Sequence, residues 1–192
     1  MAKKVFIIDS GVHQGFAHGE LNHHYAQLAQ TTLTELGYEV EVRRVEDDWD
    51  VATDAAKVAA ADIIIVQVPG FWMSIPWQLK KYLDFVFCDS QVANGDGRHR
   101  ADPSAKYGTG GKLTGKKFMI STTWNAPLEA FTDPDQFFEG KGIDGVFFPL
   151  RKTFEFIGIK DQIPTFMAND VVKNPDHEGD QARFIAHLKA NF

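Results

Sequence analysis

The stretch "DIIIVQVPGFWMSIPWQLKKYLDFVF", residues 62–87, decides the fold. Residues 62–68 contain five β-branched apolar side chains, those of Ile63, Ile64, Ile65, Val66 and Val68, which is typical of a strand buried on both faces of a parallel sheet. Residues 76–87 have the spacing of an amphipathic helix that begins near Pro76 and whose apolar face comprises Leu79, Leu83, Val86 and Phe87. The loop between them is unusual because it is rich in large apolar side chains, although loops normally meet water.

The same alternation of strand and helix recurs along the chain. Strand patterns occupy residues 3–10, 38–45, 62–68, 116–124 and 161–170, and helix patterns occupy residues 20–36, 50–61, 76–87 and 180–191. The second strand pattern alternates apolar and polar residues, as an edge strand does, and the fifth is interrupted by Pro164. Right-handed βαβ connections then predict one α/β domain over residues 1–192. We expect a flavodoxin-like three-layer sandwich with a five-stranded parallel sheet of order 2-1-3-4-5.

Composition narrows the class of protein. The chain has 192 residues, of which 44% are hydrophobic, which is enough for one sizeable core. Its net charge of −6 argues against a nucleic-acid or anionic-membrane partner. The single cysteine, Cys88, excludes an intramolecular disulfide and is read as a packing residue. No signal peptide and no membrane-spanning run of about 18 residues is found, so we expect a cytoplasmic protein.

In a sheet of this order, ligands bind at the carboxyl ends of the strands beside strand 1. The first loop there, "SGVHQGFAHGELN" (residues 10–22), contains no P-loop or G-x-G-x-x-G motif, but it opens a helix, and a helix N-terminus favours anions. His18 and Asn22 are candidate donors to a phosphate. The alternative is that Asn22 caps the helix and His18 is an ordinary surface residue.

The other two loops offer flat and hydrogen-bonding surfaces. In "PGFWMSIP" (residues 69–76) Pro69 and Gly70 let the backbone approach a ligand, and the aromatic residues Phe71 and Trp72 provide stacking faces. In "TTWNAP" (residues 122–127) Trp124 stands among three hydrogen-bonding side chains, those of Thr122, Thr123 and Asn125. Alternatively, residues 69–76 belong to the core or to a dimer contact, and Trp124 belongs to the core.

Together the three loops suit an aromatic heterocycle with a phosphate tail. Other chemistries have little support, because no carboxylate pair or Ser-His-Asp pattern is present. His23 and His24 are adjacent on a helix and point in different directions, so no metal site is expected.

Five segments resemble the flavodoxin-like NAD(P)H quinone reductases: residues 69–87, 107–117 ("YGTGGKLTGKK"), 122–127, 135–149 ("DQFFEGKGIDGVFFP") and 164–171 ("PTFMANDV"). The resemblance runs from about residue 4 to the C-terminal helix. It implies FAD as cofactor and a homodimer with one flavin site at each interface. It also implies two-electron reduction of quinones by hydride from NADPH, in a ping-pong cycle.

Matching positions with this family implies the binding residues. The pyrophosphate site would comprise His18, Gly19, Glu20, Leu21 and Asn22. The wall of the flavin site would comprise Pro69, Gly70, Phe71 and Trp72. The edge of the flavin would be held by Thr123, Trp124, Asn125 and Ala126. Tyr107 would come from the partner subunit. The first loop is one residue shorter than in close relatives. The loop after the fourth strand lacks the Tyr and His of the mammalian branch, so no catalytic acid is assigned.

Two questions stay open at this point. The long loop of residues 88–115 carries basic side chains that can hold the 2′-phosphate of NADPH or simply be solvated: Arg98, His99, Arg100, Lys106 and Lys112. The alternative functions are a flavin-binding or protein-interaction module without turnover, and a reductase of azo or nitroaromatic acceptors.

Overall fold

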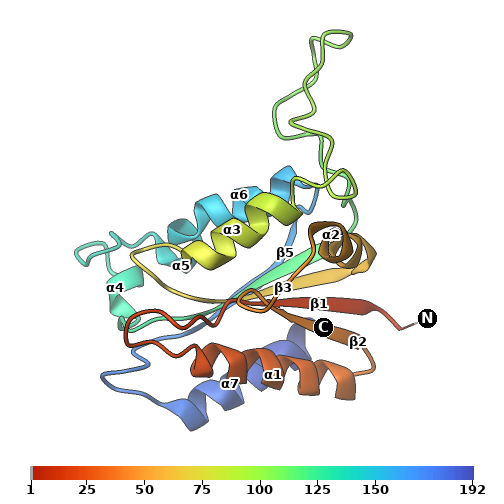
Figure 1. Ribbon diagram of the computed structural model, residues 1–192. Helices are drawn as coiled ribbons and strands as arrows, with labels where there is room; N and C mark the ends of the chain where they lie inside the picture. Colours follow the sequence, from red (N-terminus) through yellow and green to blue (C-terminus); the bar gives the residue numbers. More distant parts are fainter. Residues whose placement is uncertain (1) are drawn as a thin grey trace.

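A computed structural model describes residues 2–192 and contains one five-stranded sheet (Figure 1). Its strands are β1 (Lys4–Asp9), β2 (Glu39–Arg44), β3 (Ile63–Pro69), β4 (Lys117–Thr123) and β5 (Asp161–Ala168). All neighbouring strands pair in parallel, in the order β2-β1-β3-β4-β5. The predicted fold class and strand order are therefore confirmed.

Helices cover both faces of the sheet. Figure 1 shows α1 (Glu20–Glu35) and α7 (His177–Asn191) on one face, with α2 (Val51–Ala60), α3 (Trp77–Val86) and α6 (Phe148–Phe156) on the other. Two short helices, α4 (Glu129–Thr132) and α5 (Gly142–Val146), precede α6. Alternate residues of β1 enter different cores: Val5 and Ile7 pack towards α1 and α7, and Phe6 and Ile8 towards the other layer. Burial on both faces explains the continuous apolar runs in the sequence.

The edge strands differ in how they end the sheet. β2 is only partly buried, as its alternating sequence predicts. β5 continues through Pro164, and the register shifts opposite this residue, between Met119 and Ser121 of β4. An edge strand tolerates proline because the missing N–H needs no partner on the open side. The proline therefore produces an irregularity rather than the break that the sequence suggested.

Residues 88–115 form a long excursion between α3 and β4. In Figure 1 this segment, which we call the arm, stands away from the body of the molecule. Isolated antiparallel bridges join Ala93 to Gly111 and His99 to Asp102. Within residues 2–192, no helix is both long and apolar enough to cross a membrane.

Candidate functional site

A groove of about 580 Å³ opens at the carboxyl ends of β1, β3 and β4. This volume lies within the range of about 300–1,000 Å³ that is usual for ligand sites. Ten of the residues matched to the cofactor site line it: His18, Gly19, Glu20, Leu21, Asn22, Pro69, Gly70, Phe71, Thr123 and Asn125. The three loops singled out in the sequence thus meet at one place, as the strand order requires.

The N-terminus of α1 supplies free backbone donors at this groove. Gly19 precedes the helix with a left-handed φ of 77°, and the first bond of the turn runs from the His23 N–H to the Gly19 carbonyl at 3.0 Å. The backbone N–H groups of Glu20, Leu21 and Asn22 therefore lie ahead of the first helical hydrogen bond, and they have no acceptor within the described chain. Such a helix end binds anions.

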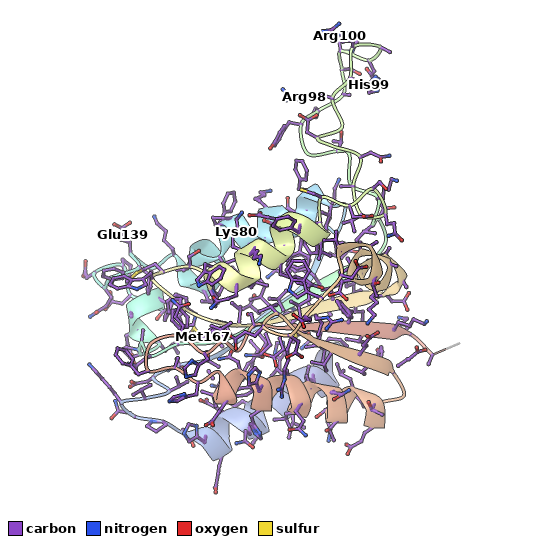
Figure 2. All side chains as sticks on the ribbon, in the orientation of Figure 1. Lys80, Arg98, His99, Arg100, Glu139 and Met167 are labelled. Carbon is purple, nitrogen blue, oxygen red and sulfur yellow. The ribbon has the colours of Figure 1, made fainter. Side chains whose placement is uncertain are left out.

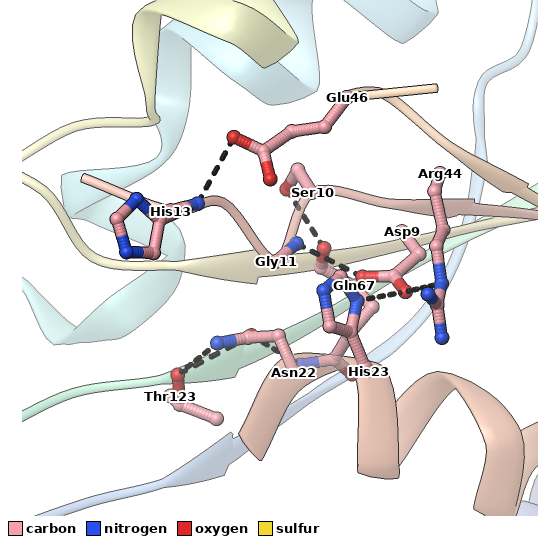
Figure 3. Close-up of polar contacts among 10 residues, drawn as sticks. All are labelled: Asp9, Ser10, Gly11, His13, Asn22, His23, Arg44, Glu46, Gln67 and Thr123. Atoms are coloured by element: carbon pink, nitrogen blue, oxygen red, sulfur yellow. Dashed lines mark hydrogen bonds and ion pairs between the residues drawn. The ribbon is translucent and has the colours of Figure 1, made fainter. Parts of the chain in front are cut away.

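The side chain of Asn22 points inward, towards β3 and β4. It neither caps the helix nor faces solvent, since Asn22 is buried, its amide donates to Thr123 Oγ1 at 3.1 Å, and its oxygen accepts from Gln67 Nε2 at 2.8 Å (Figure 3). The alternative reading of Asn22 as a helix cap is wrong. This network ties α1 to β3 and β4, so Asn22 offers the groove only its backbone.

Trp124 lies beneath the groove rather than beside it. Its side chain is 6% exposed and packs against the rings of Phe131, Phe138 and Phe147. A Cβ on Gly70 would lie 2.3 Å from the Trp124 ring, so only glycine allows the β3 loop to rest on the indole. Trp124 shapes the groove through the backbone of Gly70, and the exposed Asn125 beside it provides a hydrogen-bonding edge.

Trp72 stands at the tip of a tight hairpin. Phe71 and Ser74 exchange backbone hydrogen bonds of 3.0 and 2.9 Å, and the residues between them, Trp72 and Met73, both have positive φ. Trp72 is 90% exposed. Positive φ is unfavourable for bulky residues, and such strain concentrates at functional sites. The conformation therefore displays an indole to the outside at a cost in stability.

Five further residues line the groove and were missed by sequence reasoning: Val12, Ala17, Val171, Val172 and His177. Three of them follow β5, whose carboxyl end lies at the same edge of the sheet as those of β3 and β4. The signal that could have found these three is the predicted strand order, which places the loop after β5 beside the loop after β4.

Tyr107, which the family resemblance assigns to the cofactor site, lines a different hollow from the groove described above. It is 68% exposed at the base of the arm and packs on Phe156 of α6 with ring centroids 5.5 Å apart. It lines a hollow between α3 and α6 together with Phe87 and Cys88. Tyr107 is not part of the lining of the groove in the single chain.

A buried carboxylate lies at the end of β1. Asp9 is 1% exposed, accepts the Gly11 N–H at 2.9 Å, and lies 2.6 Å from His23 Nδ1 and 3.8 Å from Arg44 Nε (Figure 3). Burial raises the pKa of Asp9, and the hydrogen bonds of Gly11 and His23 oppose this shift only in part. The charged carboxylate is thus held at a net cost in stability.

This shift predicts a pH dependence. Because the pKa of Asp9 is higher in the folded than in the unfolded chain, its contribution to stability is present at low pH and is lost as pH rises through the folded pKa. The substitution Asp9→Asn should therefore raise the free energy of unfolding relative to the wild type, increasingly above about pH 4. Urea unfolding across a pH series measures the difference. A difference that shrinks as pH rises would contradict the assignment.

Among residues 2–192, no three His, Cys, Asp or Glu side chains gather as a metal ion would require. His23 is engaged with Asp9, whereas its neighbour His24 is exposed and packs edge-on against Tyr25. The two histidines point in different directions, as expected for adjacent residues on a helix.

Known proteins resemble this chain in sequence over its whole length. A family model described as "Flavodoxin-like fold" matches residues 3–192. The chain is 43% identical to the NADPH:quinone oxidoreductase MdaB of Haemophilus influenzae over 190 residues, 98% of each protein. It is 27% identical to human ribosyldihydronicotinamide dehydrogenase [quinone], over 73% of this chain and 56% of the human protein.

Solved structures share the fold. An NADPH-quinone reductase from P. pentosaceus superposes with a TM-score of 0.67 at 16% identity, covering 100% of this chain and 98% of the other. General stress protein 14 of Treponema denticola, in complex with FMN, gives a TM-score of 0.66 at 18% identity, covering 99% of each chain. At these identities the likeness concerns the architecture alone.

Proposed function

The chain belongs to the family with the flavodoxin-like fold, and from this membership we propose that it is an FAD-dependent NADPH:quinone oxidoreductase. In the proposed cycle, NADPH would give up a hydride and leave as NADP⁺. A quinone would then bind and leave as the hydroquinone, with the two electrons and the proton of that hydride and one further proton from solvent, which is a ping-pong sequence. The observation that carries the proposal is the convergence of three loops on one groove, in a chain 43% identical to an NADPH:quinone oxidoreductase over its whole length.

The residues present fit a flavin with a phosphate tail. The free amides at the start of α1 suit a pyrophosphate. The backbone of Pro69, Gly70 and Phe71 forms a wall of the groove, and Gly70 can lie against the Trp124 ring because it has no Cβ. The N–H of Asn125 has no acceptor within the described residues and suits a carbonyl at the edge of the ring system. When bound, the flavin accepts hydride and passes two electrons on, and the protein orients it and tunes its charge.

FAD is favoured over FMN by the lining of the groove beyond the phosphate end. Val171, Val172 and His177 line the groove next to the start of α1, and Val172 is 69% exposed. An exposed apolar side chain beside a phosphate site offers a contact to an adenine ring, which only FAD carries. One fold neighbour was solved with FMN, and chromatography of the flavin released from this protein distinguishes the two cofactors.

We propose that the side chains and backbone of this protein position the flavin and do not donate or accept protons in the reaction. Thr123 Oγ1 is occupied by Asn22, so we assign the hydrogen bonds at the flavin edge to the backbone at Asn125 and Ala126. Such fixed N–H dipoles stabilise negative charge that develops on the bound ring. Phe71 and the strained, exposed Trp72 are proposed to flank the slot in which nicotinamide and quinone bind in turn.

The 2′-phosphate of NADPH is assigned to the arm. Arg98 is paired with Asp96 at 2.6 Å and lies over the ring of Tyr107 at 5.3 Å. Among the described residues of the arm, the basic side chains of His99, Arg100 and Lys106 are exposed and make no hydrogen bond or ion pair, and His99 and Arg100 lie near the tip (Figure 2). Lys112 donates to the Ser90 carbonyl at the base of the arm. Basic side chains at the tip of the arm suit a phosphate monoester if, in a dimer, the arm of one subunit lies near the groove of the other.

A homodimer through α3 and α6 would complete the site. Two hollows, of about 610 and 390 Å³, lie between these helices, and their lining includes the exposed side chains of Trp77 and Tyr107. Phe148, at the start of α6, is 52% exposed. Exposed aromatic residues of this kind mark protein contacts. On this face the exposed Tyr107 is proposed to contact the groove of a partner, as the family resemblance implies.

The dimer predicts a strong effect of Trp77→Asp. Trp77 is 61% exposed in the single chain, so the change should cost little in folding, but it would bury a charge in the interface. We expect the dimer dissociation constant to rise by a factor on the order of 30 or more, measured by sedimentation velocity. Leu36→Asp, at the far end of α1, is the matched control and should stay dimeric. A wild-type monomer at micromolar concentration would contradict the interface.

Spectroscopy of the purified protein tests the function. We expect the purified protein to be yellow and to release FAD on denaturation, which chromatography identifies. NADPH should bleach the colour, and a quinone should restore it. Release of FMN would correct the cofactor. Recovery with an azo or nitroaromatic compound but not with a quinone would change the acceptor. Colourless protein that cannot be reconstituted with either flavin would favour an interaction module.

A further inference from the structure

The two ends of the first loop meet at the imidazole of His23. A Cβ on Gly11 would lie 2.6 Å from the Gly19 carbonyl oxygen and 2.8 Å from His23 Nδ1, and a Cβ on Gly19 would lie 3.0 Å from His23 Nε2. Both glycines therefore pack directly on the ring. The loop of residues 11–19 is closed at its base by this contact.

Asp9 holds the ring in place. Its Oδ2 accepts from His23 Nδ1 at 2.6 Å, while its Oδ1 accepts from the Gly11 N–H at 2.9 Å, so one carboxylate binds both the ring and the start of the loop (Figure 3). With Nδ1 donating, Nε2 is the ring atom turned towards Gly19. The exposed side chain of Arg44, at the end of β2, approaches the same carboxylate, with its Nε 3.8 Å from Oδ2.

The contact with Gly19 bears directly on the phosphate end of the groove. Gly19 is the residue before α1, and the free amides of Glu20, Leu21 and Asn22 follow it. The direction of these amides depends on the backbone of Gly19, whose left-handed φ is not otherwise enforced by a side-chain cap. A shift of the His23 ring would therefore re-aim the donors.

We propose that Asp9 and His23 form a positioning pair that aims the first-turn amides of α1 at the pyrophosphate of the cofactor. Neither residue touches the phosphate; they act through Gly11 and Gly19. This inference rests on the proposed flavin function. The buried carboxylate is held at a cost in stability next to a ligand groove, and a local cost of this kind is expected where a binding site is being organised.

Flavins with and without phosphate separate positioning from general damage. His23→Leu removes the donor to Asp9, and we expect it to weaken FAD binding about tenfold, because oriented helix-terminal dipoles contribute on that scale. Riboflavin, which has no phosphate, should bind the variant as it binds the wild type. His23→Asn places an amide donor near the position of Nδ1 and should restore most of the affinity for FAD.

His24→Leu is the matched control, because it removes the neighbouring exposed histidine and should change neither affinity. Hydrogen exchange of the flavin-free protein gives a second readout: amides of residues 11–22 should exchange faster in His23→Leu than in His24→Leu. Equal losses of FAD and riboflavin, or an unchanged affinity for FAD, would overturn the positioning role. If the wild type binds no flavin at all, the proposed function falls first and this inference falls with it.

Discussion

Replacing Gly70 with alanine is expected to weaken flavin binding by about tenfold or more and to lower the free energy of unfolding by about 1–3 kcal/mol. The added Cβ would lie 2.3 Å from the buried ring of Trp124, whereas nonbonded carbons normally stand about 3.5–4.0 Å apart. Trp124 is held by Phe131, Phe138 and Phe147, so the β3 loop has to move instead, and it carries the proposed flavin wall with it. Flavin titration and thermal unfolding measure the two effects.

Two further variants test the cause. Gly115→Ala has open space around its Cβ but a left-handed φ, so it should cost about 1 kcal/mol and leave flavin binding unchanged. Trp124→Phe combined with Gly70→Ala should recover part of the loss, because a smaller ring makes room for the methyl group. If the double variant is no better than the sum of the single ones, the Gly70–Trp124 contact does not control the groove.

Asp54→Ala is expected to have the largest effect on stability, about 3–5 kcal/mol, and to lower the melting temperature by about 10 °C. Asp54, in α2, is fully buried, lies 2.8 Å from Arg43 Nε, and accepts from Arg43 Nη2 at 3.0 Å and from the Tyr82 hydroxyl at 3.1 Å. Removing the carboxylate leaves a guanidinium without its counter-charge and a buried hydroxyl without its acceptor. Denaturant unfolding measures the change.

An exposed ion pair on the same helix provides the control. Lys57→Ala breaks the contact between Lys57 and Glu41, which both reach solvent, and should cost no more than about 1 kcal/mol. Neither Asp54 nor its two partners lines the groove, so the flavin affinity of the folded Asp54→Ala protein should stay close to that of the wild type. Equal costs for the two substitutions would show that burial does not strengthen the Asp54 network.

The architecture was predictable because it depends on local patterns. β1 and β3 each contain four consecutive apolar residues, 5–8 and 63–66, which indicates strands covered on both sides, and β2 alternates, which indicates an edge. Once five strands alternate with helices, the handedness of βαβ connections leaves few orders. Pro164 was the exception, because only the pairing of β5 with β4 shows that the proline meets a register shift.

The site was predictable at the level of loops but not of side chains. Strand order brought the loops after β1, β3 and β4 together, and ten of the fourteen matched residues line one groove. The position of Trp124 in the core was one of the two alternatives that the sequence left open, whereas the direction of Asn22 was not predictable, because it is set by partners distant in the chain. Asn22 turns to Gln67 and Thr123, and Trp124 turns to a cluster of phenylalanines.

The sequence by itself determined the class of fold, the strand order, the loops that meet at the groove and, through family resemblance, the chemistry to expect. The tertiary structure alone decided that Asp9 and His23 close the first loop and that Asp54 joins Arg43 to Tyr82. The physical reason is one of range. Periodicity records which face of each element is buried, whereas a hydrogen bond between distant residues exists only after the parallel strands have set the elements side by side.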